Sequence, residues 1–245
     1  MLMKTDFSAI LLAAGEGRRL RPQTLSTPKC LMPINGTPIL DLWIETLVSH
    51  KKLTQIIINT SYLAGKVEKH INRHKHREKI SISFEPKLLG TAGTVKKLER
   101  RIKTEHIFIA HADNLSCFDI NTFFSEHLKK PNECDVTMMT FDPHDPRTCG
   151  IVCLDKRRIV TSYTEKPKSF LPGEANAAVY FFNKSGLENI RNMEKVFDLS
   201  RDVIPHFVGK IFAWKNSIYH RDIGTPESYK LSQTEFRKFR PKERE

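Results

Sequence analysis

Short apolar runs and helically spaced apolar residues alternate along the first half of this chain. Residues 7–14 form a largely apolar run that ends at a glycine, which is typical of a strand buried on both faces of a parallel sheet. Apolar residues then recur at helical spacing between positions 39 and 48, and residues 55–59 form a second apolar run. These positions predict a strand, a helix and a second strand, and therefore one β-turn-α-β unit.

The alternation continues to residue 110 and then changes character. We expect a polar helix over residues 62–76, a strand over 80–84, a helix over 92–103 and a strand over 106–110. Beyond residue 135 the pattern is rich in strands, at residues 136–141, 150–154, 159–164 and 175–182. The whole pattern predicts an α/β fold, a Rossmann-like three-layer α/β/α sandwich with a mixed, partly antiparallel sheet.

No Pro-, Gly- or Ser-rich linker and no internal repeat divides the chain. We therefore predict a single domain over residues 1–245, with a first half over about 1–115, a β-rich second half over about 116–232 and a tail over 233–245. We expect the charged tail to be a helix end that frays into solvent.

Charge adds an anionic partner to this picture without identifying it. Lysine and arginine total 40 and aspartate and glutamate total 28, which gives a formal net charge of +12. Nucleic acid, an anionic membrane and a polyphosphate substrate all fit such a charge. The five cysteines lack metal-site spacing and predict reduced thiols. The first residues lack the layout of a signal peptide, and no run is long enough to span a membrane, so we expect a cytoplasmic protein.

A glycine- and arginine-rich stretch follows the first predicted strand. It reads GEGRRLRP at residues 15–22 and lies at the carboxyl end of the strand, where open α/β sheets bind ligands. Glycines let backbone N–H groups approach phosphate oxygens, and arginines hold such oxygens in pairs. A third glycine is absent at Leu20 and no Gly-Lys-Ser/Thr follows, so the stretch is neither a dinucleotide fingerprint nor a Walker loop. Downstream, TPKCLMPI at residues 27–34 holds Lys29 between two prolines.

These two stretches together resemble the opening signature of the sugar-phosphate nucleotidylyltransferase family, G-x-G-(T/S)-R-L-x-P-x-T followed by P-K-x-L-x-P-(I/V). The similarity continues in order through LGTAG at 89–93, Asp113, EKP at 165–167, NAAVY at 176–180 and DIGTP at 222–226. The resemblance implies the reaction of a nucleoside triphosphate with a sugar 1-phosphate to give a nucleotide sugar and pyrophosphate. It also implies that the first half binds the nucleotide and the second half the sugar phosphate.

The resemblance assigns roles to residues by position. As catalytic residues it implies Arg19, Lys29, Asp113 and Lys166. As the ligands of a Mg²⁺ cofactor it implies Asp113 and Asp222, a choice that suits the preference of magnesium for one or two carboxylates plus phosphates and water. The implied nucleotide-binding residues are Leu12, Ala13, Ala14, Gly15, Gly17, Arg18, Arg19, Lys29, Gly90, Thr91 and Ala92. The implied sugar-phosphate-binding residues are Asp113, Glu165, Lys166 and Asn176.

Several positions depart from the family pattern. Arg18 stands where the family has a small hydroxyl residue, Ala178 replaces a glycine, and His220 stands where the family often has tryptophan. His111-Ala112 replaces Asn-Gly before Asp113, and we expect the histidine either to touch substrate or to pack structurally.

A basic stretch with three histidines, at residues 70–77, is open to two interpretations. His70 and His74 share a helical face, which a metal or nucleic-acid site would need. A solvated basic helix end explains the stretch with fewer assumptions, because it lacks aromatic residues for stacking bases.

The substrates follow from one further stretch. EPKLLGTAG at residues 85–93 is most similar to enzymes that use GTP with mannose- or heptose-type phosphates, so we favour guanylyl transfer. Uridylyl or thymidylyl transfer remains an alternative, as does a catalytically silent module that binds a nucleotide sugar. We expect neither a nucleic-acid nor a membrane partner, because charge alone does not explain the ordered motifs.

Overall fold

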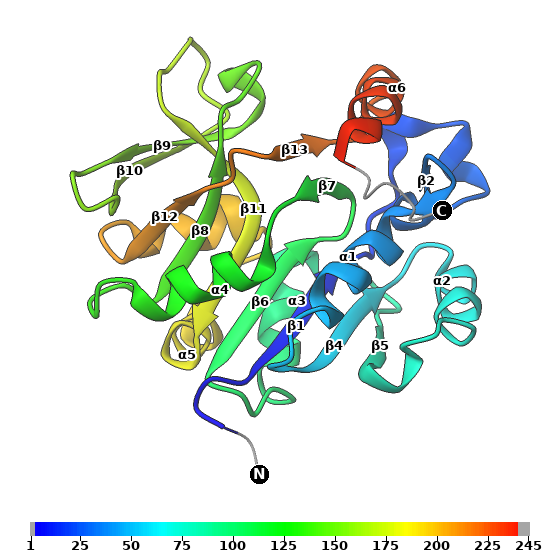
Figure 1. Ribbon diagram of the computed structural model, residues 1–245, viewed down its shortest axis with the longest axis horizontal. Helices are drawn as coiled ribbons and strands as arrows, with labels where there is room; N and C mark the ends of the chain where they lie inside the picture. Colours follow the sequence, from blue (N-terminus) through cyan, green and yellow to red (C-terminus); the bar gives the residue numbers. More distant parts are fainter. Residues whose placement is uncertain (1–2, 240–245) are drawn as a thin grey trace.

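The computed structural model describes residues 3–239, and its centre is a mixed sheet that begins with the first apolar run (Figure 1). All six residues of β1 (Phe7–Leu12) are buried, as expected for a strand covered on both faces. The parallel part of the sheet has the order β6 (His106–His111), β1, β4 (Leu53–Thr60) and β5 (Ile80–Phe84). The predicted β-turn-α-β unit is confirmed, since β1 and β4 are parallel neighbours.

The second half of the chain extends this sheet with antiparallel strands. β11 (Glu174–Asn183) pairs antiparallel with β6 on one side and with β8 (Val136–Phe141) on the other. The remaining strands are β12 (Ile211–Lys215), parallel to β8, and the hairpin of β9 (Gly150–Leu154) and β10 (Val160–Glu165), which joins the start of β11. The predicted mixed sheet is therefore confirmed.

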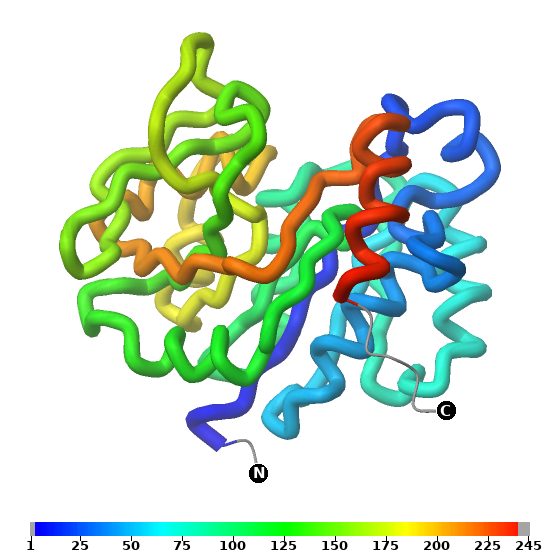
Figure 2. The backbone as a smooth tube through the Cα atoms, turned by 45° about the horizontal axis from the view of Figure 1, so that its top comes forward, coloured from blue at the N-terminus to red at the C-terminus, as the bar shows by residue number. Residues whose placement is uncertain are grey.

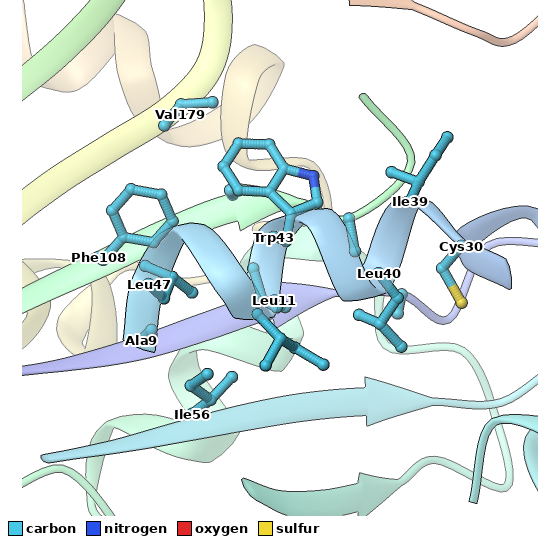
Figure 3. Packing of buried hydrophobic residues seen from close by; sticks show 14 of the residues in the cluster. Ala9, Leu11, Cys30, Ile39, Leu40, Trp43, Leu47, Ile56, Phe108 and Val179 are labelled. Atoms are coloured by element: carbon cyan, nitrogen blue, oxygen red, sulfur yellow. The ribbon is translucent and has the colours of Figure 1, made fainter. Parts of the chain in front are cut away.

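Helices cover both faces of the sheet and complete three layers. Ala9 and Leu11 point into a core that Trp43 and Leu47 of α1 close (Figure 3). The alternate residue Ile10 points to the opposite face, as the two-residue period of a strand requires. The first face carries α1 (Ile39–Val48), α2 (Ala64–Ile71) and α4 (Ile120–Lys129), and the second carries α3 (Gly90–Glu99) and α5 (Lys184–Asn192).

A two-stranded ribbon connects the two halves of the molecule. β7 (Asn114–Cys117) pairs antiparallel with β13 (Tyr219–Asp222), and the chain then enters α6 (Pro226–Glu235). Figure 2 shows this last segment passing from the strand-rich half back to the half that holds β1. A short hairpin of β2 (Pro33–Ile34) and β3 (Thr37–Pro38) lies beside α6, where the Tyr229 hydroxyl donates to the Pro33 carbonyl at 2.7 Å.

The described part of the tail packs on the domain. Residues 233–239 were expected to fray into solvent, and this expectation is wrong, because Phe236 is 6% exposed in the core and the Gln233 side chain accepts a hydrogen bond from the backbone N–H of Asn35. Residues 240–245, which the same expectation covers, lie outside the described residues. Within residues 3–239, no helix has the length and apolar character needed to cross a bilayer.

Candidate active site

Only one of the two glycines in the arginine-rich loop is required by the backbone. Gly17 has φ +62°, and a Cβ placed there would lie 2.9 Å from Thr24 Cγ2 and 3.1 Å from Lys29 Cβ. The Thr24 hydroxyl also donates to the Gly17 carbonyl at 2.8 Å. Gly15 has open space around it. The loop therefore folds closely over Thr24 and Lys29, and the missing side chain at Gly17 permits this.

The arginines of this loop point to different partners. Arg18 pairs with Glu16 at 2.7 Å, and Arg21 lies 3.5 Å from the same carboxylate. Arg19 turns the other way and lies 3.5 Å from Asp222. Of the three, Arg19 alone lines the cavity that Lys29, Asp113 and Asp222 also line.

Lys29 lies between the two aspartates that the sequence singled out. Its side chain is 8% exposed, and its ammonium group donates to Asp113 at 2.8 Å and to Asp222 at 3.2 Å. Asp113 follows β6, while Asp222 ends β13 opposite Asn114 of β7. The ribbon thus brings together carboxylates that are far apart in the sequence.

These contacts keep both members of the Lys29–Asp113 pair charged. Burial acts to lower the pKa of Lys29, but the neighbouring Asp113 and Asp222 carboxylates outweigh it and raise that pKa above its ordinary value. Burial likewise acts to raise the pKa of Asp113, and the charge and the hydrogen bond of Lys29 hold it below the ordinary value. The ammonium is thus a counterion between two carboxylates that would otherwise repel each other.

The two carboxylates suit Mg²⁺ chemically. Both reach one ammonium nitrogen, so their oxygens converge on a common point, and both are hard oxygen donors. Within the described ranges, no cluster of three or more His, Cys, Asp or Glu side chains is arranged to enclose a metal. A cation that takes two protein ligands and completes its shell with phosphate and water fits this donor set.

A second group of polar residues, from β10, the turn after it and β11, lines the same cavity. Glu165 ends β10, and Lys166 follows with φ +46° and its N–H bonded to the Cys149 carbonyl at 3.0 Å. The Tyr163 hydroxyl donates to Glu165, and the Asn176 amide donates to the Tyr180 hydroxyl at 2.7 Å. This network fixes the Glu165 and Asn176 side chains.

A bulge in β11 presents Asn176 to the cavity. Pairing with β8 shifts register between Asn176 and Tyr180, and Ala178 within the shift has φ +53°. The Ala178 N–H donates to Asn176 Oδ1 at 2.9 Å. The residue that replaces the family's glycine thus adopts the left-handed conformation that favours glycine.

The cavity between these groups has a volume of about 760 Å³. It brings together seven of the residues named from the sequence: Arg19, Lys29, Asp113, Glu165, Lys166, Asn176 and Asp222. It does not include the residues expected at the nucleotide from the end of β1 and the start of α3. Leu12, Ala13 and Ala14 are buried. At the start of α3, the Ala92 N–H donates a hydrogen bond to the Phe197 carbonyl, and the Thr91 hydroxyl accepts one from the Leu199 N–H.

A buried network in the first half of the chain was not predicted from the sequence. Asn59 accepts a hydrogen bond from the Ala13 N–H at 2.7 Å and donates to Glu85 at 3.1 Å and to Thr94 at 3.0 Å. Glu85 is 1% exposed and also accepts from the Leu89 N–H at 3.2 Å. The network ties the end of β1 to the start of α3. Its signal was present, because Asn59 and Glu85 are polar residues at the carboxyl ends of adjacent parallel strands.

Two histidines that depart from the family pattern line the same cavity. His220 shares a hydrogen bond with the Ser116 hydroxyl at 2.7 Å, and burial lowers its pKa to about 4, so its ring is neutral at pH 7. His111 Nε2 is buried, and among the described residues it has no hydrogen-bond partner. The loop over residues 142–149, which the sequence did not single out, forms another wall.

Comparison with known proteins gives concordant results. The family model described as nucleotidyl transferase matches residues 8–237. The chain is 28% identical over 226 residues to the mannose-1-phosphate guanylyltransferase of Mycobacterium tuberculosis, covering 90% of this chain and 62% of that protein. It is 27% identical over 233 residues to the D-glycero-alpha-D-manno-heptose 1-phosphate guanylyltransferase of Aneurinibacillus thermoaerophilus, covering 94% and 99%.

A solved structure has the same fold. HddC from Yersinia pseudotuberculosis, complexed with GMP-PN, superposes with a TM-score of 0.76 at 25% identity and covers 94% of this chain and 99% of that one. The chain spans about three fifths of the mannose-1-phosphate guanylyltransferases that it matches and nearly all of the heptose-1-phosphate relative.

Proposed function

Because this chain belongs to the nucleotidyl transferase family, we propose that it transfers the guanylyl group of GTP to a sugar 1-phosphate and releases pyrophosphate. The names of its relatives favour a sugar of mannose or manno-heptose type. The observation that carries the proposal is one cavity lined by cationic groups from both halves of the chain, Arg19 and Lys29 from the first half and Lys166 from the second.

The reaction needs charge neutralisation and alignment. An oxygen of the sugar phosphate attacks the α-phosphorus of GTP, and the bond from that phosphorus to the β-phosphate oxygen breaks, so pyrophosphate leaves with the electron pair. Lys166 would hold the attacking phosphate, while Arg19 and Lys29 would neutralise the triphosphate and the departing pyrophosphate. The protein supplies no nucleophile, and its contribution is to orient two anions that repel each other in water.

Asp113 and Asp222 are the residues that would hold Mg²⁺. When bound, the ion supplies positive charge to the phosphate oxygens. Lys29 contacts both carboxylates, so its ammonium group would balance their negative charge before the ion and the substrates arrive.

Glu165 and Asn176 form the proposed sugar end of the cavity. The Tyr163 hydroxyl donates to Glu165 Oε2, which leaves Oε1 of the same carboxylate as an acceptor for a sugar hydroxyl. Lys166 Nζ lies 4.0 Å from that Oε1, so the phosphate-binding cation and the hydroxyl-binding carboxylate are adjacent. A sugar 1-phosphate carries a phosphate and hydroxyl groups on one small ring, so it could contact both side chains at once.

A pyrophosphate-release panel tests the proposal. It crosses ATP, CTP, GTP, UTP and dTTP with mannose 1-phosphate, a manno-heptose 1-phosphate and glucose 1-phosphate, with and without Mg²⁺. We expect the highest rate with GTP and a manno-configured sugar, and loss of activity in Asp113→Asn. A preference for UTP or dTTP would overturn the guanylyl assignment. Nucleotide-sugar binding without turnover in any pair would favour the silent module.

Lys166→Ala tests which end of the cavity binds the sugar phosphate. We expect the KM for sugar phosphate to rise about tenfold more than the KM for GTP, because one charge-assisted contact is lost on that side. Lys168→Ala is the matched control, since Lys168 is an exposed lysine two residues away and outside the cavity lining. The opposite ranking of the two KM values would place Lys166 at the nucleotide.

A further inference from the structure

A second cavity is lined by residues of α1, of α2 and of the turn after α2, and it shares no lining residue with the proposed active site. Figure 1 shows α2 on the opposite side of the molecule from β9 and β10. The volume of the second cavity is about 930 Å³. The charged residues in its lining are four cations from α2 and the turn after it, and two carboxylates from α1: Lys66, Lys69, Arg73 and Lys75 with Asp41 and Glu45. The proposed reaction uses none of them.

The two carboxylates already have partners. Asp41 Oδ1 lies 2.6 Å from His70 Nε2, and Glu45 Oε2 lies 3.0 Å from Lys75 Nζ. For the remaining three cations, Lys66, Lys69 and Arg73, the described part of the chain places no carboxylate oxygen within 4.0 Å. Their spacing of three and four residues puts them on one face of α2 and its continuation. These three cations form a wall of the cavity, and no carboxylate oxygen of residues 3–239 lies within 4.0 Å of them.

Lys66 is held in position at this wall. Its ammonium group donates one hydrogen bond to the Ser26 carbonyl, which leaves two N–H groups for a ligand. A cation that is already fixed loses less conformational entropy when it binds an anion than a freely moving one does.

The histidines beside the wall do not suit a transition metal. His74 Nε2 lies 3.8 Å from Asp41 and 3.9 Å from Glu45, which by distance alone resembles a ligand set. However, His74 Nδ1 accepts the N–H of His76 at 3.2 Å, so the proton of the neutral ring is on Nε2, the atom that would have to bind the metal. The histidines instead join α2 and its following turn to the carboxylates of α1.

We propose that this cavity is a second anion site, which binds a small polyphosphate through Lys66, Lys69 and Arg73. Ammonium and guanidinium groups on one face match several phosphate oxygens, and arginine adds paired donors. The residues that line it include no Phe, Tyr or Trp within the described ranges, so the cavity offers no aromatic platform for nucleic-acid bases. A compact phosphate compound fits this recess better than an extended strand.

Isothermal titration calorimetry of the full chain with inorganic pyrophosphate, without Mg²⁺ and at about 0.15 M salt, tests the proposal. We expect two binding events, one at the arginine-rich loop and one at the second cavity. In Lys69→Ala/Arg73→Ala, one event should weaken at least about tenfold while the other is retained. In Arg19→Ala, the event at the arginine-rich loop should weaken, and the event at the second cavity should be retained. If the proposed guanylyl transfer is not observed, pyrophosphate should still bind at the second cavity, so each proposal can fail without the other.

Arg100→Ala/Lys103→Ala is the matched control, because it removes the same net charge from exposed positions at the end of α3. It should retain both events. Equal weakening in the control and in the cavity variant would overturn the proposal, since the effect would then be general charge. Two further results would also overturn it: sulfate binding as tightly as pyrophosphate, or a single-stranded RNA 12-mer binding more tightly than pyrophosphate in a Lys69- and Arg73-dependent manner.

Discussion

At the residue scale, Ala178 combines an ordinary side chain with a left-handed backbone. Its φ of +53° costs an L-amino acid about 1–2 kcal/mol, and glycine would not have this strain. Glycine is, however, more flexible in the unfolded chain, which offsets about 0.5–1 kcal/mol of the gain. We therefore expect Ala178→Gly to raise the free energy of unfolding by about 0.5–1 kcal/mol, measured by urea denaturation.

Ala177→Gly is the control for this substitution. Ala177 is fully buried one residue earlier in β11, and it is not among the residues with positive φ. The same change there should lower the free energy of unfolding by about 1 kcal/mol. If both variants were destabilised alike, the strain assigned to Ala178 would be absent.

Lys29 predicts an unusual separation of metal affinity from turnover. Its ammonium contacts the two carboxylates that would hold Mg²⁺, and like charges repel. Lys29→Met should therefore bind Mg²⁺ several-fold more tightly in the absence of substrates, while kcat falls by about 100-fold or more because the phosphates lose a cation.

Calorimetry with Mg²⁺ and steady-state kinetics measure these two effects on the same sample. Arg18→Met provides the comparison, because Arg18 belongs to the same basic loop but pairs with Glu16 and does not contact either aspartate. Weaker Mg²⁺ binding in Lys29→Met would mean that the carboxylates need the ammonium group to stay in place.

At the scale of elements, the arginine-rich loop depends on close packing at Gly17. A Cβ there would meet Thr24 and Lys29, and the backbone has positive φ. We expect Gly17→Ala to lower the free energy of unfolding by about 1–3 kcal/mol, through strain and displaced neighbours. The urea midpoint reports this change.

Gly15→Ala separates packing from composition in the same loop. No atom lies within 4 Å of a Cβ at Gly15, so its effect on the urea midpoint should be small. If both variants lost a comparable amount of stability, the contact of a Cβ at Gly17 would not be the cause of the loss.

The sequence predicted the parallel strands better than the connections between distant segments. The run at β1 is apolar throughout because helices cover both sides of it, so pattern alone identifies it. The helices α4 and α5 were not predicted, although apolar residues lie on one face of each. The contact of Lys29 with Asp113 and Asp222 spans 84 and 193 residues, and it depends on the pairing of β7 with β13. No local pattern contains that information. The ordered family motifs implied that these residues share one site, but not that Lys29 bonds to both carboxylates.

At the scale of the whole molecule, buried histidines make stability depend on pH. Burial holds the pKa below its ordinary value in several imidazoles: His50, His74, His106, His127 and His220. Such a group binds a proton more readily when the chain is unfolded. The contribution of these histidines to the free energy of unfolding is therefore fully present above about pH 6.5 and is lost as the pH decreases below it.

His127 should account for much of this slope. It is fully buried between His106, at 3.0 Å, and Thr137, at 2.8 Å, and its pKa lies well below the ordinary value because of burial and the nearby Lys130 and His106. In His127→Gln, the loss of unfolding free energy between pH 6.5 and 5 should be smaller by about 1.4 kcal/mol per pH unit. His206→Gln, at an exposed position, should retain the parent slope. An unchanged slope in His127→Gln would contradict this account.

The ribbon of β7 and β13 also determines the order in which the two aspartates become available during synthesis. Translation proceeds from the N-terminus, so β1, β4, β5 and β6, with Asp113 behind them, emerge from the ribosome about a hundred residues before β13. A nascent chain can therefore form the parallel core while it still lacks its second carboxylate. The proposed metal site is therefore complete only late in synthesis, because its second aspartate lies on the strand that pairs with β7.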